Sequence, residues 1–413
     1  IHCGLVGSEM CIRDRTIAEI TRRQDDPEVY GMIQKADTVG VFQIESRAQM
    51  SMLPRLRPKT YYDLVIQIAI VRPGPIQGDM VHPFLKRRDG IEPVTFPSDE
   101  VKDVLSRTMG VPIFQEQVIK LAMVAAGFSG GEADQLRRAM ASWKKNGDLV
   151  KFRTKLIEGM LARGYEQEFA ERIFDQILGF GEYGFPESHS ASFAVLAYCS
   201  AWLKHYHPEA FYASLLNSLP MGFYSASQLV QDARRHNVLI LPVCVNQSHY
   251  DHQVVHCGNR LAIRLGFRQI KGFSAESTLQ LLKARGKQGF QHPKQLKHIG
   301  LSQRDLELLA SANAMQTIAN NRFQTRWAMM DSLSDLPLFK DLEEPQSDSI
   351  NTPTEVQTLL EDYSSIGLSL SKHPITLLEQ AGVLGRFTRM KELIHKPHPV
   401  SYTHLTLPTR CLG

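Results

Sequence analysis

The sequence has few cysteines, no long apolar run and little net charge. Of its six cysteines, three lie within residues 1–15 and 399–413, and Cys199, Cys244 and Cys257 are scattered through the remainder. Three dispersed thiols exclude the disulfide framework of a small secreted domain. Their number and spacing agree with a cytoplasmic protein. Because no apolar run reaches membrane-spanning length, we expect the protein to be soluble and to have no membrane partner. A net charge of +4 allows a nucleic-acid partner only where cations cluster.

The two ends of the chain lack the pattern of folded sequence. Residues 1–15 begin with Ile1 and have neither the apolar run of a signal peptide nor a helix or strand period. Residues 399–413 are equally unpatterned. We interpret both stretches as non-native sequence and expect the remainder to be an internal fragment of a longer protein.

Between these ends the composition is that of a globular protein. The 413 residues are 43% hydrophobic and 22% charged, and the length is sufficient for two or three domains. The periodicity predicts a mainly α (α+β) fold. We expect a helical domain over 16–240, short strands plus paired helical hairpins over 241–320, an acidic linker over 330–351 and the start of a C-terminal domain over 352–398.

Residues 179–192, "GFGEYGFPESHSAS", predict a loop between two helices. Before them, residues 169–177 carry apolar side chains at helical spacing, and three glycines and a proline end that helix. After them, residues 193–198 are apolar nearly all round, which is typical of a buried helix. Ser190 and Ser192 are placed to cap this second helix.

The start of that second helix is a candidate phosphate site. A helix N-terminus offers unpaired N–H groups and the positive end of the helix dipole, so Ser188, His189 and Ser190 lie where a phosphate can bind. A phosphotransferase with Ser188 as nucleophile and His189 as base is a weaker alternative, because no third orienting group is near in sequence.

Residues 130–145 predict a helix with a basic face. Leu136, Met140 and Trp143 recur at helical spacing and are expected in the core. The same spacing places four cations on adjacent exposed strips: Arg137, Arg138, Lys144 and Lys145. Arginine binds phosphate through a planar fork, and lysine acts as a point charge. The alternative is an ordinary solvated basic face.

Five segments occur in an order that resembles successive blocks of the bacterial C-family replicative DNA polymerases of the alpha-subunit type. They are "ADTVGVFQIESRAQM", "RPGPIQG", "FQEQV", "ADQLRRAM" and "YGFPESHSASFA". The resemblance extends from Thr16 to His398. The residues of these segments are most similar to those of the error-prone branch of the family. In that family these blocks form the fingers domain, which closes over the incoming nucleotide, and the region after it. The resemblance therefore implies that residues 16–240 are a fingers domain.

The resemblance also implies binding roles. Arg72, Arg137, Arg138 and His189 would bind the incoming triphosphate, and Lys144 and Lys145 would add positive field. The prolines after Arg72 hold it extended on a stiff turn, which lowers the entropy lost on binding an anion, although a plain surface turn explains it equally. The implied partners are primer–template DNA, deoxynucleoside triphosphates, a sliding clamp and damage-response proteins.

Two N-terminal segments have open interpretations. Residues 61–71 have a β-branched run that suggests a strand, whereas the resemblance implies a helix. Residues 45–47 are a polar cluster after a compact strand or turn at 39–44. Ser46 in this cluster is either functional or the cap of a helix.

Residues 242–263 change to short strands and contain a group of histidines and cysteines. These residues are Cys244, His249, His252, His256 and Cys257. They invite a zinc site, but their spacing is not that of a paired metal-ligand motif, and His256 and Cys257 would point to opposite faces of a strand. We therefore predict no metal site.

Residues 270–274 predict a tight turn before a helix. Backbone N–H groups of such a turn hold a DNA phosphate in helix-hairpin-helix modules, with lysines alongside. Lys271, Gly272, Ser274 and Lys283 are the candidate DNA-binding residues, although Ser274 stands where such turns have a second glycine. A degenerate second copy is expected over 296–314. The alternative is a purely structural helical pair.

The chain lacks the carboxylates that templated nucleotide addition needs. That reaction uses two metal ions clamped by acidic side chains, and no Asp-x-Asp lies on a predicted strand between Thr16 and His398. The C-family resemblance implies a palm domain upstream that supplies them. We therefore assign no catalytic residue here and expect Mg²⁺ for the full-length enzyme, with none bound by this chain. The rival interpretation is a non-catalytic DNA-binding or scaffold protein.

Overall fold

The computed structural model describes residues 19–20, 25–71, 78–146, 149–179, 185–222, 224–330 and 351–384. These residues divide into two compact units. The first comprises the chain up to Leu241 together with Asp251–Gly266, and the second comprises Pro242–Tyr250 and the chain from Phe267 onward. Each unit is described by itself.

The first unit is helical with one small sheet. Its helices are α3 (Pro27–Gln34), α4 (Arg47–Leu56), α5 (Tyr61–Ile70), α6 (Gly78–Arg88), α7 (Asp99–Leu105), η1 (Ser106–Thr108), α8 (Gln115–Ala126), α9 (Gly130–Asn146), α10 (Leu149–Ala162), α11 (Gln167–Gly179), α12 (Glu187–Tyr206), α13 (Pro208–Asn217) and α14 (Ala226–Arg235). The mainly α prediction is confirmed.

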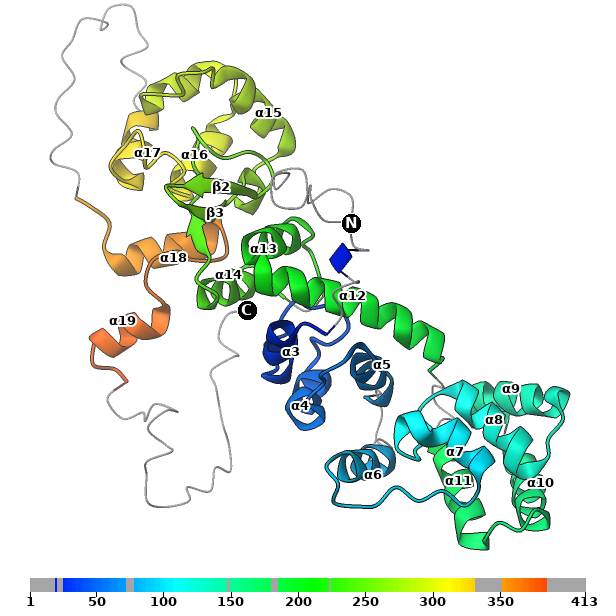
Figure 1. Ribbon diagram of the computed structural model, residues 1–413. Coiled ribbons are helices and arrows are strands. Elements are labelled where there is room, and N and C mark those ends of the chain that lie inside the picture. Colours follow the sequence, from blue (N-terminus) through cyan, green and yellow to red (C-terminus); the bar gives the residue numbers. More distant parts are fainter. Residues whose placement is uncertain are drawn as a thin grey trace, which may run out of the picture. The chain divides into compact units, whose positions relative to one another are not determined.

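Helix α5 packs along α12 and forms the centre of one part of this unit (Figure 1). Its residues Leu64–Ile70 are all buried despite their β-branched side chains. A capping box starts the helix, because Thr60 accepts from the N–H of Asp63 and the Asp63 carboxylate accepts from the N–H of Thr60. These residues therefore form the helix that the family resemblance implies, and not the strand that the β-branched run suggests. Ser46 likewise caps α4 by accepting from the N–H of Gln49.

Helices α7 to α11 pack on one another (Figure 1). One face of α8 lies in the core, since Val118, Leu121, Ala122 and Ala125 are all buried. Helices α8 and α10 approach so closely at Gly159 that a Cβ there would lie 2.2 Å from the carbonyl oxygen of Ala126. Only a residue without a side chain allows this contact.

Gly159→Ala is expected to destabilise the protein by about 2 kcal/mol, because the added methyl meets backbone atoms that cannot rotate away. The matched control is Gly31→Ala in α3, where nothing lies within 4 Å of the position that a Cβ would take. That change should stabilise by up to about 1 kcal/mol through helix propensity alone. Urea unfolding of both variants measures the difference, and equal effects would contradict the close approach.

A three-stranded sheet follows α14, in the order β1 (Leu239–Leu241), β3 (Arg260–Arg264) and β2 (Gln253–Cys257). β1 pairs with β3 in parallel, with Leu239 opposite Ala262, and β2 pairs with β3 antiparallel, with Cys257 opposite Arg260. The predicted short strands are present, and β1 begins slightly before the predicted region.

The second unit contains two matching turns. Its helices are η2 (Phe267–Gln269), α15 (Ala275–Ala284), η3 (Pro293–Ile299), α16 (Gln303–Ser311), α17 (Arg322–Met330), α18 (Glu355–Ser365) and α19 (Pro374–Gln380). Before α15 and again before α16, a glycine of positive φ (82° at Gly272, 85° at Gly300) precedes a buried apolar residue and a capping serine. The predicted second hairpin is therefore present.

Within the described residues, no helix is both long and apolar enough to span a membrane.

Candidate nucleotide and nucleic-acid interface

Helix α12 begins at Glu187, several residues before the predicted start. The prediction that Ser190 and Ser192 cap this helix is wrong, because both lie inside its first turns. Ser192 instead donates to the carbonyl of Ser188 at 2.9 Å, four residues back. The N-cap is Pro186, whose backbone is extended. Proline has no backbone N–H, so no donor is left unpaired at this position. The helix N-terminus therefore lies closer to the end of α11 than the sequence indicates.

Ser190 is fully buried, and its hydroxyl donates to the carbonyl of Val65 on α5. A buried hydroxyl that is already paired holds α12 against α5 and faces away from solvent. Ser190 is therefore a packing residue, and we remove it from the candidate phosphate ligands.

Ser188 and His189 lie in the exposed first turn of α12. The His189 ring packs edge-on against Phe193, with 6.3 Å between ring centroids, and Phe193 in turn meets Phe185 and Phe42 edge-on. Aromatic contacts of this kind restrict the ring of His189. Both predicted residues thus remain accessible at a helix start.

The N-terminus of α12 already receives an anion from the protein. The carboxylate of Glu116, in the first turn of α8, accepts from the N–H of Glu187 at 3.0 Å. Nearby, the Glu187 carboxylate accepts from the hydroxyl of Tyr62 at 3.0 Å and pairs with Arg107 at 3.3 Å, and the Arg107 guanidinium lies 4.0 Å from the centre of the Tyr62 ring. Sequence reasoning missed Glu116, Tyr62 and Arg107, and no local pattern marks them.

The two arginines of α9 share one carboxylate. Arg137 and Arg138 each lie 2.9 Å from an oxygen of Asp134, one turn before them in the helix. The hydrogen bond from Arg137 is the main cause that lowers the pKa of Asp134. Both arginines are exposed, so these pairs orient the side chains and contribute little stability.

Three candidate cations lie where the structure gives no side-chain position. Arg72 is outside the described residues, and Lys144 and Lys145 belong to α9 but their side chains are not described. Leu136 is buried as predicted, and the Met140 and Trp143 side chains are likewise outside the described part.

In the described part of the chain, one group of acidic and histidine side chains has the spacing of metal ligands: Asp37, Asp232 and His236. It contains none of the five residues weighed for zinc. The fully buried Lys204 ammonium lies 2.9 Å from Asp37 and 3.0 Å from Asp232, so it already supplies the positive charge that a metal would bring. This cluster joins α12 to α14 and is a structural ion network.

The DNA-binding candidates around the first matching turn are partly engaged by the protein. Lys271 donates its backbone N–H to the carbonyl of Ser365 at 2.9 Å and its ammonium to the carbonyl of Tyr363 at 2.8 Å. Ser274 caps α15 by accepting from the N–H of Ser277 at 2.9 Å. Lys283 lies near the other end of α15, about 13 Å along the helix axis from Ser274. The structure thus places Lys271, Gly272 and Ser274 together and separates Lys283 from them.

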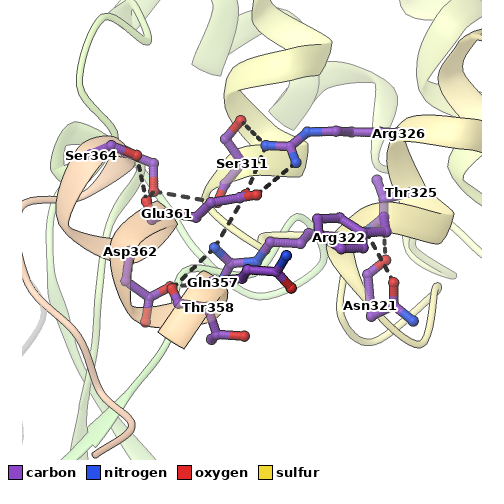
Figure 2. A network of polar contacts seen from close by, with 12 residues as sticks. Ser311, Asn321, Arg322, Thr325, Arg326, Gln357, Thr358, Glu361, Asp362 and Ser364 are labelled. Atoms are coloured by element: carbon purple, nitrogen blue, oxygen red, sulfur yellow. Dashed lines mark hydrogen bonds and ion pairs between the residues drawn. The ribbon is translucent and has the colours of Figure 1, made fainter. Parts of the chain in front are cut away.

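Helix α18 is fixed to α17 by buried charge (Figure 2). The guanidinium of Arg322, only 2% exposed, lies 2.6 Å from Asp362 and 3.4 Å from Glu361. Arg326 makes a forked contact to both oxygens of Glu361 at 2.9 and 2.7 Å. Leu359, Ile366 and Leu368 are buried. Residues 355–368 are therefore integral to the second unit.

Two family models match parts of this chain. The family model described as bacterial DNA polymerase III alpha subunit finger domain matches residues 11–164. This match lies within the first unit. A helix-hairpin-helix family model matches residues 237–325, which include both matching turns. The resemblance identified from the sequence is confirmed.

The chain is also similar to several proteins named error-prone DNA polymerase. It is 70% identical over 387 residues to one from Vibrio parahaemolyticus, 65% identical over 395 residues to one from Vibrio vulnificus and 58% identical over 370 residues to one from Idiomarina loihiensis. These alignments cover 94%, 95% and 88% of the chain. The chain spans 38%, 39% and 36% of the length of those relatives.

Proposed function

We propose that this chain provides the incoming-nucleotide-binding fingers and a DNA-backbone-binding module of an error-prone DNA polymerase that acts on damaged templates. The observation that carries the proposal is the succession of a finger domain and a helix-hairpin-helix tandem within one chain that is 70% identical to an error-prone polymerase over 94% of its length. The partners are primer–template DNA and deoxynucleoside triphosphates in the cytoplasm, with a sliding clamp and damage-response proteins as accessory partners.

On this proposal the finger domain binds the triphosphate with Arg72, Arg137, Arg138 and His189, and Ser188 contributes at the helix start. Lys144 and Lys145 add positive field. The Asp134 carboxylate orients the side chains of the two α9 arginines. Exposed ion pairs of this kind stabilise a protein by about 0–1 kcal/mol. A polyphosphate can therefore displace the carboxylate at little cost in free energy. A bidentate arginine–phosphate contact is stronger than the pair it replaces.

Mg²⁺ is the cofactor that the polymerase family implies, and the one described group of acidic side chains with metal-ligand spacing, together with the acidic residues of α9, is already paired with cations of the protein. Asp37 and Asp232 are bridged by Lys204, Asp134 is paired with two arginines, and Glu132 is paired with Lys155. We therefore assign this chain to nucleotide and DNA binding and propose that the metal-binding carboxylates belong to a palm domain of the full-length protein.

Replacing Arg137 and Arg138 together with alanine in the full-length polymerase is expected to raise KM for the incoming nucleotide about tenfold or more, because two phosphate contacts are lost. Steady-state primer extension measures this. Arg172→Ala on α11, an exposed arginine outside the proposed site, is the control and should leave KM unchanged. An unchanged KM in a folded double variant would remove these arginines from the site.

The rival is a DNA-binding or scaffold protein without polymerase activity. It shares the helix-hairpin-helix tandem but does not require the finger domain to bind nucleotide. Titration of the intact chain with nucleotide in an isothermal calorimeter separates the two hypotheses. The rival predicts that the parent chain releases no more heat of binding than the Arg137→Ala, Arg138→Ala double variant.

A further inference from the structure

Phe42 is held outward by a rigid turn of the first unit. Its neighbours Val41 and Ile44 are fully buried, whereas the Phe42 side chain is 38% exposed. The buried hydroxyl of Thr38 closes the turn by donating to the carbonyl of Ile44 at 2.8 Å. The N–H of Phe42 donates to the hydroxyl of Ser200 on α12 at 3.2 Å. Contacts on both sides of the exposed ring therefore fix its position.

The backbone of this turn is also unusual. Gln43, directly after Phe42, has a φ of 65°, in the left-handed region that residues with a side chain rarely adopt. The buried ammonium of Lys204 holds the start of the turn, because it lies 2.9 Å from Asp37 and donates to the carbonyl of Val39 at 3.1 Å. Conformations of this kind persist where surrounding contacts impose them, and they concentrate at binding sites. An exposed ring on such a turn indicates a contact surface.

Phe42 continues an exposed apolar surface of α12. His189, Phe193 and Leu196 are four and three residues apart, which places them on one face of the helix. The rings of Phe42 and Phe193 meet edge-on with 5.4 Å between their centroids, and Leu196 is 41% exposed. Residues 190–203 of this helix contain no charged side chain. Phe42, Phe193 and Leu196 thus form an apolar strip that begins one helical turn from His189.

The apolar strip suits the uncharged part of a nucleotide. On the proposed function His189 binds the triphosphate, and Phe193 and Leu196 lie about 6 and 10 Å further along the helix axis. The base belongs to the same molecule as these phosphates and lies at its other end. Aromatic side chains stack on nucleobases whatever their identity. A DNA backbone instead requires cations, which the apolar strip lacks.

We propose that the apolar strip receives the base of the incoming nucleotide, with the Phe42 ring as its main stacking contact. The inference rests on the proposed function, namely that this domain binds the nucleotide through His189. Stacking grows with the apolar area that is covered, so the strip favours the larger purine bases over pyrimidines. This preference is expected to be greatest opposite a template position without a base, where base pairing contributes nothing.

The test measures kcat/KM for each of the four deoxynucleoside triphosphates in primer extension by the full-length polymerase, opposite each template base and opposite an abasic site. Phe42→Ala should lower kcat/KM about tenfold for the purine nucleotides and about threefold for the pyrimidine nucleotides, because pyrimidines cover less of the ring. Phe42→Tyr retains the ring and should stay within about twofold of the parent.

A matched pair of leucine variants controls for the loss of exposed apolar surface. Leu196→Ala should lower kcat/KM for the purine nucleotides about threefold, because part of the surface under the base is lost. Leu161 on α10 is 42% exposed, against 41% for Leu196, and lies outside the apolar strip. Leu161→Ala should therefore leave kcat/KM unchanged.

Three outcomes would overturn the inference. If Phe42→Ala lowers kcat/KM for all four nucleotides by the same factor, the apolar strip serves packing within the polymerase and not stacking on the base. If Phe42→Ala has no effect while the Arg137 and Arg138 double variant raises KM, the inference is wrong and the proposed function stands. If neither change alters the use of nucleotide, the proposed function of this domain falls, and the inference falls with it.

Discussion

Lys204→Met is expected to lower the free energy of unfolding of the first unit by about 3–5 kcal/mol, because it leaves two carboxylates facing each other without the buried cation between them. Lys204 is fully buried and lies within 3.0 Å of both Asp37 and Asp232. It also donates to the carbonyl of Val39 at 3.1 Å. Methionine has a side chain of similar length and volume. The substitution therefore removes the charge and the contacts to Asp37, Asp232 and Val39 without leaving a large cavity. Urea unfolding followed by circular dichroism measures the loss.

Two comparisons make this prediction specific. Lys35→Met removes an exposed lysine from the same neighbourhood and should change stability by less than about 0.5 kcal/mol. Asp232→Asn added to Lys204→Met should recover part of the loss, because it removes one of the two opposed charges. A single-variant loss no larger than that of Lys35→Met would show that the ion network does not stabilise the fold.

Lowering the pH should reduce the difference in the free energy of unfolding between the parent protein and Lys204→Met. Burial alone would raise the pKa of Asp37, but the hydrogen bond from His236 and the charge of Lys204 lower it to about 2 from 3.8. A carboxyl with a lowered folded pKa stabilises the protein above its unfolded pKa, and that contribution is lost as the pH falls through the folded pKa. The stability of the parent should therefore decline between about pH 4 and pH 2 more steeply than that of the variant.

Arg322→Met is expected to destabilise the second unit by about 3 kcal/mol and to release α18. The side chain is 2% exposed and is the partner of Asp362 at 2.6 Å, and Asp362 also accepts from the hydroxyl of Ser369 at 2.7 Å. Without the guanidinium, a largely buried carboxylate has no cation. Hydrogen exchange of the α18 amides should accelerate much more than exchange in α15.

Arg326→Met is the matched control for this change. Arg326 is 30% exposed and binds only Glu361 and Ser311 among the described side chains, so its loss should cost about 1 kcal/mol. If the two arginine variants have equal effects, the burial of Arg322 is not what fixes α18. If neither variant alters exchange in α18, the docking of this helix on the Lys271 turn depends on its apolar contacts alone.

Local sequence features determined most of the helices and their ends. The capping box at Thr60 and Asp63, the cap at Ser46 and the glycine–apolar–serine turns at 272–274 and 300–302 all act within a few residues, so they are visible in the sequence. The order of the five resemblance segments indicated a finger domain, and the tight turn at 270–274 indicated a helix-hairpin-helix module; family models of both kinds match the chain.

The tertiary structure alone decided which candidate side chains are available to a ligand. Ser190 pairs with Val65, 125 residues earlier, and Glu116 reaches the N-terminus of α12 from 71 residues away. Lys271 meets Tyr363 across 92 residues. No local periodicity encodes these contacts, because each depends on which two surfaces pack together. The sequence therefore determined the secondary structure and the family, and three-dimensional packing determined which polar groups are already used by the protein itself.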